Sequence, residues 1–382
     1  MNAYAASVYE IHLTHKYDSH GTRYKHLFHL AYLYSWAKEI DVNLERQLLL
    51  GEGLSQPQIR SFAAWLRNRS VQNNGVLPYK KRKTFNAVLS MCSVISCWFI
   101  SQFASPKSKT QHERTIGIQI LIDAQKRMWK DAKVRVRQDS VATDLTDEEI
   151  SKIESYLRPE NRSSAVSKAI ANRDYLIWRM AIEFGMRLGE ILAMRVEDCP
   201  TRNKPYFSIV RIEERGPDYF DPRTDAPRPK TLSRDLGYQL SDTAFPKLVS
   251  NYISEHRYIR VEHKGRKINR FSLSHKFLII ARNGNPLSGK MADKIAQSIK
   301  KATGVDFHWH LARHAFFNRA YSAVVDVENP TVKDARVADL VVWGGWEDPE
   351  SLGIYSRRAR RERAKTPLHL WQQGNNEWKA LN

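Results

Sequence analysis

The chain has 382 residues, and its 61 lysine and arginine residues outnumber its 41 aspartate and glutamate residues to give a formal net charge of +20. This length suffices for two domains with hydrophobic cores. The positive excess favours a polyanionic partner, nucleic acid before an anionic membrane surface, because each phosphate contact releases condensed counterions. Three cysteines without metal-ligand spacing exclude a disulfide framework and fit a reducing compartment.

The first third of the chain predicts a helical bundle. Its apolar residues recur at helical spacing in four segments, which are residues 22–40, 56–69, 80–103 and 112–133. The most apolar run, residues 88–100, is too short to cross a bilayer, and the amino terminus lacks the layout of a signal peptide. We therefore expect a soluble, cytoplasmic protein with no membrane partner. Its first domain is expected to span residues 1–140.

A polar, basic stretch at residues 133–143 predicts the linker between two domains. Its arginines, Arg135 and Arg137, are candidate phosphate contacts, although a solvated charge run fits the pattern equally well. The linker ends at Thr146, which with Glu149 has the spacing of a capping box that starts a helix.

The second domain, residues 141–382, predicts many helices with a small antiparallel sheet, an α+β fold that is mostly α. Strands are expected at residues 206–213, 234–240 and 277–281. Helices are expected at residues 165–184, 188–195, 243–256, 289–302, 310–324, 335–343 and 351–363.

Three clusters of residues in this domain have the chemistry for attack on a phosphodiester. The first follows a glycine break, where Arg187 begins a helix and Glu190 lies on the same face three residues later. An arginine fork stays charged and can bond two phosphate oxygens. The alternative is an ordinary surface pair between the two side chains.

The second cluster begins a helix, where His310 and Arg313 can point the same way. Arg313 would be a second phosphate clamp and His310 a proton carrier near neutral pH. Two alternatives are a helix-start histidine satisfied by the backbone and a zinc site formed with His308 and His314. Zinc is disfavoured because no further cysteine or carboxylate stands at ligand spacing.

The third cluster joins Trp346 to Tyr355, nine residues later. A tyrosine on an amphipathic helix is usually a core residue, and its phenol is a weak nucleophile until positive neighbours stabilise the phenolate. A basic run follows that would hold flanking DNA, beginning with Arg357 and Arg358. Another basic cluster opens the third predicted helix: Lys80, Lys81, Arg82 and Lys83.

These motifs, in this order, resemble the tyrosine recombinases of the phage-integrase type. Gly185, Arg187 and Glu190 match the Gly-x-Arg-x-x-Glu start of the family. Lys230 opens a Lys-Thr-x-x-Arg match, and His310, Arg313 and His314 match the His-x-x-Arg-His block. Gly345-Trp346 replaces the usual Gly-His, and Tyr355 follows at the family's spacing. The resemblance covers residues 146–365 and extends loosely to the helical first third.

The resemblance implies cleavage by Tyr355 through a 3′-phosphotyrosyl link, for integration or excision of a mobile element. Arg187, Arg313 and Trp346 would stabilise the phosphorane, Lys230 would protonate the leaving oxygen, and His310 would assist, with Glu190 and His314 in support. No cofactor and no metal would be needed. The implied partners are double-stranded DNA, further copies in a synaptic tetramer formed from monomers, and accessory DNA-bending proteins.

Three rival functions remain compatible with the sequence. A type IB topoisomerase uses a similar set of groups on one strand, and a non-catalytic protein of the same fold would only bind DNA. A basic RNA-binding scaffold is the third, and the chain lacks the aromatic motifs of common RNA modules.

Overall fold

The computed structural model describes residues 4–69, 77–107, 110–136, 144–201, 203–238, 244–263, 266–353 and 355, with backbone alone at 79–80, 260–263 and 266–271. The chain divides into two compact units, an N-terminal unit (Met1–Ser140) and a C-terminal unit (Val141–Asn382). Each unit has its own hydrophobic core.

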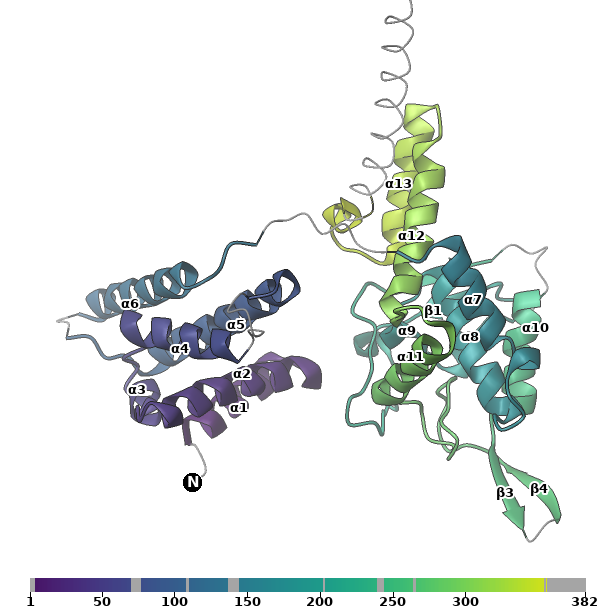
Figure 1. The fold of residues 1–382 in the computed structure, drawn as a ribbon, viewed down its shortest axis with the longest axis horizontal. Helices are drawn as coiled ribbons and strands as arrows, with labels where there is room; N and C mark the ends of the chain where they lie inside the picture. The colour runs from purple at the N-terminus through teal and green to yellow at the C-terminus, as the bar shows by residue number, and fades with distance from the viewer. Residues whose placement is uncertain are drawn as a thin grey trace, which may run out of the picture. The chain divides into compact units, whose positions relative to one another are not determined.

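The described part of the N-terminal unit is entirely helical (Figure 1). Its elements are α1 (Tyr4–Lys16), α2 (His20–Glu39), α3 (Leu44–Leu49), α4 (Gln56–Asn68), α5 (Tyr79–Phe103) and α6 (Gln111–Asp131). The four predicted helices are confirmed as α2, α4, α5 and α6. Capping boxes at Ser55 and Thr110 start α4 and α6, since each hydroxyl and its partner three residues later satisfy two free amide groups.

The prediction of only four helices was wrong, because α1 and α3 were missed. Helix α1 buries Ala5, Tyr9 and Leu13, a single line of residues four apart that gives little apolar periodicity. Helix α3 has six residues, too few for a periodic pattern to be visible.

Helix α5 is the central element of this unit. Its segment Lys81–Phe103 is long and apolar enough to cross a membrane by length and composition alone. It packs against α2, α3, α4 and α6, and fully buried side chains such as Leu89, Ile95 and Phe99 lie in the unit's core. The helix was predicted at nearly these bounds, but its apolar stretch is longer than the 13 residues given by the sequence analysis. Its packing is that of a core helix.

The C-terminal unit is built around α8 (Lys168–Phe184), which buries residues on nearly every face. It packs against α7 (Asp147–Leu157) and α12 (Trp309–Val325). Further helices are α9 (Leu188–Ala193), α10 (Ala244–Asn251), α11 (Gly289–Thr303) and α13 (Pro330–Gly344). The capping box of Thr146 and Glu149 at the start of α7 is confirmed.

Two antiparallel hairpins complete the described part of this unit. Strand β1 (Tyr206–Ile209) pairs with β2 (Arg234–Gly237), with Tyr206 opposite Gly237, which confirms the predicted sheet. The second hairpin, β3 (Ile259–His263) with β4 (Arg266–Phe271), was missed; it extends away from the helical body (Figure 1). The strand predicted at 277–281 forms only isolated bridges, of which one joins Phe277 to Arg195. The fold class, mostly α with a small antiparallel sheet, is confirmed.

The chain after α13 packs against α12 of the same unit. A 3-10 turn at Pro349–Leu352 follows, and Leu352 and Tyr355 are buried in a small cluster with Phe317 of α12. The helix predicted at residues 351–363 lies outside the described residues beyond Tyr355.

Candidate active site

Arg187 is the N-cap residue of α9, two residues after a left-handed turn at Gly185. Helix α8 ends at Gly185, whose backbone φ of +61° is in the left-handed region that favours glycine. A side chain there would also meet Phe316 at 2.5 Å and Phe317 at 2.9 Å. The turn leaves the Arg187 side chain partly exposed at the start of α9, which fits a group that has to meet a ligand.

Glu190 lies at the centre of a buried polar network. It is 2% exposed and accepts hydrogen bonds from the Arg187 amide at 2.8 Å and the Arg187 guanidinium at 3.3 Å. The Thr231 hydroxyl donates at 2.7 Å, and the Arg234 guanidinium donates to both carboxylate oxygens at 3.1–3.2 Å. Burial alone would raise the pKa of Glu190, and the positive charges of Arg234 and Arg313 outweigh it and lower that pKa.

Arg313, on the first turns of α12, is 1% exposed. Its guanidinium donates to the Gly185 carbonyl at 2.6 Å and to the Gly344 carbonyl at 3.0 Å. Arg187 donates to the same Gly344 oxygen at 3.1 Å. Two arginines that lie 126 positions apart in the sequence thus converge on one carbonyl group. Burial, and then the charge of Arg187, lower the pKa of Arg313 to about 9, so the group is still a cation at neutral pH.

Tyr355 lies beside this pair of guanidinium groups. It is 3% exposed, and its ring centroid is 5.5 Å from those of His314 and Phe317. Burial raises the pKa of Tyr355, while the charges of Arg313 and Arg187, and a hydrogen bond with Arg313, act to lower it. At neutral pH the phenol is protonated, and the groups that would stabilise its phenolate are in contact with it or close by.

Trp346 forms one wall of the same cluster. It follows Gly345, whose φ of +63° ends α13 in the left-handed region. Its ring centroid lies 5.8 Å from that of Tyr355, and the Arg313 guanidinium carbon lies 5.0 Å from the indole ring centre. This arrangement allows a cation–π contact that orients Arg313.

His310 and His314 face one another on α12, with ring centroids 4.2 Å apart. The pKa of each is lowered to about 4. Desolvation is the main cause for both, and positive neighbours, including Arg313, add to it. His310 is therefore neutral at pH 7, which differs from the expectation of a group that titrates near neutral pH. A neutral imidazole can accept a proton.

Lys230 lies on the loop that leads into β2, and its side chain is exposed. The loop itself is attached to the site. The next residue, Thr231, donates to Glu190, and the Leu232 amide donates to the Gly345 carbonyl at 3.1 Å. The structure therefore brings the backbone of Lys230 beside the cluster, while its ammonium group faces solvent.

The expected DNA contacts are distributed over both units. Lys81, Lys83 and Arg135 are exposed, and Arg82 donates to the Leu77 carbonyl at 3.3 Å. The side chain of Lys80 and the residues Arg137, Arg357 and Arg358 lie outside the described residues.

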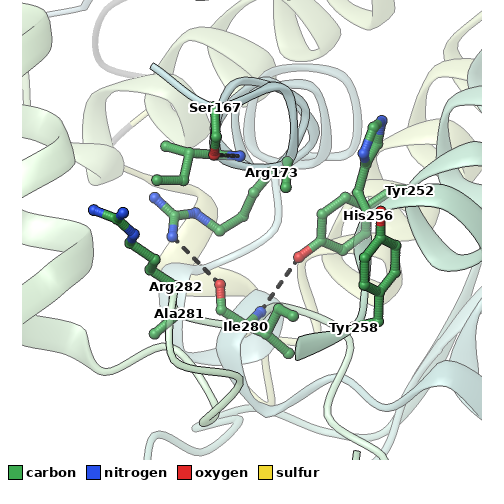
Figure 2. A pocket seen from close by; sticks show the side chains of 10 residues that line it. Ser167, Arg173, Tyr252, His256, Tyr258, Ile280, Ala281 and Arg282 are labelled. Atoms are coloured by element: carbon green, nitrogen blue, oxygen red, sulfur yellow. Dashed lines mark hydrogen bonds between the residues drawn. The ribbon is translucent and has the colours of Figure 1, made fainter. Parts of the chain in front are cut away.

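The described part of the chain has no cluster of metal ligands, and its cavity at the start of α8 lies away from this site. No three His, Cys, Asp or Glu residues there gather as metal ligands. A cavity of about 320 Å³ lies at the opposite end of α8 (Figure 2). There Arg173 donates to the Ile280 carbonyl at 3.3 Å, and the Tyr252 hydroxyl accepts from the Ile280 amide at 3.4 Å. The first bond joins α8 to the 277–281 segment, and the second joins the short helix Tyr252–His256 to it.

Sequence reasoning missed the importance of Arg234. Its side chain is 4% exposed and holds Glu190. The signal was present in the Lys-Thr-x-x-Arg match, whose last residue is Arg234. A sequence pattern alone does not tell which of its two basic residues is buried.

The chain is similar to a transposase and to transposon integrases. Transposase A of transposon Tn554 from Staphylococcus aureus is 24% identical over 299 residues, which cover 75% of this chain and 71% of the transposase. Two structures of the Tn1549 transposon integrase, one with circular intermediate DNA and one with transposon right end DNA, share the fold. They cover 94% of this chain and 98–99% of their own, with TM-scores of 0.54 and 0.55 at 14–15% identity.

The family model described as "Phage integrase family" matches residues 144–361, the segment that holds every residue of the cluster described above. This match spans more than half of the chain. The protein therefore belongs to the phage integrase family and is a tyrosine-type site-specific recombinase.

Proposed function

We propose that this protein cleaves and rejoins DNA at the ends of a mobile element, with Tyr355 as its nucleophile. The observation that carries the proposal is that Arg187 and Arg313 share the Gly344 carbonyl at the end of α13, with Tyr355 beside both guanidinium groups. The similarity to a transposase and to transposon integrases supports the mobile element as the biological substrate.

The chemistry follows from the groups present. The Tyr355 oxygen attacks the scissile phosphorus, the bond from phosphorus to the 5′ oxygen breaks, and a 3′-phosphotyrosyl link forms. The phenol proton passes to neutral His310 or to water, and Lys230 supplies a proton to the 5′ oxygen that leaves. A 5′ hydroxyl of another strand reverses the same steps, so the phosphodiester is restored without an external source of energy.

Arg187, Arg313 and Trp346 stabilise the phosphorane in this proposal. Arg187 is anchored through Nη1 on Glu190 and the Gly344 carbonyl. Arg313 is anchored through Nη1 on the Gly185 carbonyl and through Nη2 on the Gly344 carbonyl. The other N–H groups of the two forks would bond the phosphate oxygens. Removal of one such preorganised donor typically costs about 2.7–4 kcal/mol of transition-state stabilisation. Glu190 and His314 support the cluster by contacts with Arg187 and with His310 and Tyr355.

The two units of the chain would have different roles. Residues 1–140 would clamp DNA and residues 141–382 would carry out catalysis, on double-stranded DNA in the nucleoid of the cytoplasm. The exposed basic residues Lys81, Lys83 and Arg135 would contact phosphates, as would Lys80, Arg82, Arg137, Arg357 and Arg358. Recombination would proceed in a tetramer of copies that are monomers in solution, with accessory DNA-bending proteins where the site requires them.

The test is a covalent trap. Nicked suicide duplexes that cover the DNA flanking the gene are incubated with the protein, and the adduct is sought by denaturing electrophoresis. We expect the adduct with the wild type and none with Tyr355→Phe. Tyr252→Phe removes the hydroxyl of a buried tyrosine that lies near the start of α8, at the opposite end of that helix from the site. It is the matched control and should form the adduct. An adduct with Tyr355→Phe would refute the assignment.

One rival has the same chemistry. A type IB topoisomerase would relax a supercoiled plasmid that lacks the element's ends, whereas a recombinase needs paired sites. Relaxation without such sites would favour the topoisomerase. DNA binding without any adduct would favour a non-catalytic protein of this fold.

A further inference from the structure

Arg234, the first residue of β2, uses every nitrogen of its guanidinium within the protein. Its Nε donates to the Trp343 carbonyl at 2.6 Å. Its Nη1 donates to Glu190 and to the Thr231 hydroxyl at 3.2 and 3.1 Å, and its Nη2 donates to both Glu190 oxygens. With 4% of its side chain exposed, Arg234 has no free donor to offer a DNA phosphate.

The carbonyl that Arg234 holds is next to the one that the two phosphate-binding arginines hold. Trp343 accepts from Arg234, and Gly344 accepts from Arg187 and Arg313. Three arginines from β2, α9 and α12 therefore fix one turn of the chain. Trp346 lies two residues after Gly344.

The contact between Arg234 and this turn is close enough to exclude any side chain. At Gly345 an added Cβ would lie 2.6 Å from the Arg234 Nη1 atom. The Arg234 guanidinium is packed directly on the backbone at Gly345. A small displacement of this guanidinium should therefore move that backbone, because a packed core responds to a change of even one methylene group.

Arg234 also holds the loop that carries Lys230. It donates to the Thr231 hydroxyl and to the Leu232 carbonyl at 3.1 and 3.3 Å. The Leu232 amide in turn donates to the Gly345 carbonyl at 3.1 Å. The loop and the turn after α13 are thus joined twice, once through the backbone and once through Arg234.

We propose that Arg234 is a positioning residue for strand cleavage. Through Glu190, the Trp343 carbonyl and the Thr231–Leu232 segment, it fixes both phosphate-binding arginines and the Lys230 loop in a single arrangement. This inference rests on the proposed function, and it concerns geometry only, since the donors of Arg234 are all used within the protein.

The test compares Arg234→Gln and Arg234→Lys with Arg215→Gln. Arg215 is a matched control because it too forms a buried two-bond pair, with Asp198 at 2.8 and 2.5 Å, in the same unit and without contact to the cluster. Single-turnover adduct formation on the suicide duplex is measured at saturating DNA, together with the equilibrium Kd for that duplex.

We expect Arg234→Gln to slow adduct formation about 100-fold, the loss typical of a small misplacement of reacting groups, with an unchanged Kd. Arg234→Lys should recover part of the rate, because it restores the charge without the planar fork. Arg215→Gln should match the wild-type rate once folded. Equal rates in Arg234→Gln and Arg215→Gln, or a Kd that weakens in parallel with the rate, would overturn the inference. If Arg234→Gln does not fold, Arg234→Lys decides, and a wild-type rate there overturns it.

A second readout needs no DNA. Amide hydrogen exchange should accelerate at Leu232 and Trp346 in the Arg234 variants and stay at the wild-type rate in Arg215→Gln. Unchanged exchange in the Arg234 variants would contradict a positioning role. If the wild type forms no adduct on any duplex, the recombinase proposal fails, and the exchange rates still decide the role of Arg234.

Discussion

Gly185→Ala offers a sharp test of how α8 positions the two arginines. Gly185 and Gly304 both end helices in the left-handed region, at φ of +61° and +73°. Around Gly304 nothing lies within 4 Å of an added Cβ, whereas at Gly185 that atom would meet Phe316 and Phe317. The pair of alanine variants therefore separates the backbone cost from the steric cost.

The expected magnitudes follow from these two contributions. An L-residue in the left-handed region costs about 1–2 kcal/mol, so Gly304→Ala should lose about that much unfolding free energy. Overpacking adds about 1–3 kcal/mol, so Gly185→Ala should lose about 2–5 kcal/mol. The contacts cannot relax easily, since Phe317 is fully buried and its ring packs against Trp346 and Tyr355.

The steric displacement should also reach the chemistry. The Gly185 carbonyl accepts from Arg313, so Gly185→Ala should slow adduct formation about 100-fold, and Gly304→Ala should leave it unchanged. Urea unfolding measures the stabilities and the suicide duplex measures the rates. Equal stabilities for the two variants, or a wild-type cleavage rate in Gly185→Ala, would refute the reasoning.

Two further predictions concern the aromatic side of the site. Trp346→Phe keeps a ring against Tyr355 but removes the indole donor, so the rate of adduct formation should fall about 10²–10³-fold. Trp346→His restores a donor and should recover most of the rate. Equal rates for the two variants would exclude a donor role. The pKa of His314 is about 4 in the folded protein, below its value in the unfolded chain. As the pH falls, the unfolded chain therefore takes up a proton at His314 before the folded protein does. The contribution of neutral His314 to the free energy of unfolding is therefore complete above about pH 6.5. It is lost as the pH falls toward 4, by at most about 1.4 kcal/mol per pH unit. His314→Asn should remove that part of the slope in unfolding curves measured at each pH, and an unchanged slope would contradict it.

Elements that depend on local interactions could be predicted from the amino-acid sequence. Ser55, Thr110 and Thr146 start helices because their hydroxyl groups satisfy free amides within the next turn, which the sequence shows directly. The order and spacing of the motifs around Arg187, Arg313 and Tyr355 indicated the family for the same reason, since each motif is read within a few residues.

The contacts between distant groups could not be predicted, because they arise from the packing of the folded chain. Arg187 and Arg313 share the Gly344 carbonyl, and Arg234 holds Glu190, through contacts across 31 to 157 positions that no local pattern records. The lowered pKa of His310 likewise depends on neighbours brought together by packing. Helix α3 was missed because it is too short to show a period, and its stability comes from burial of residues such as Leu44 and Leu48 against the rest of the unit.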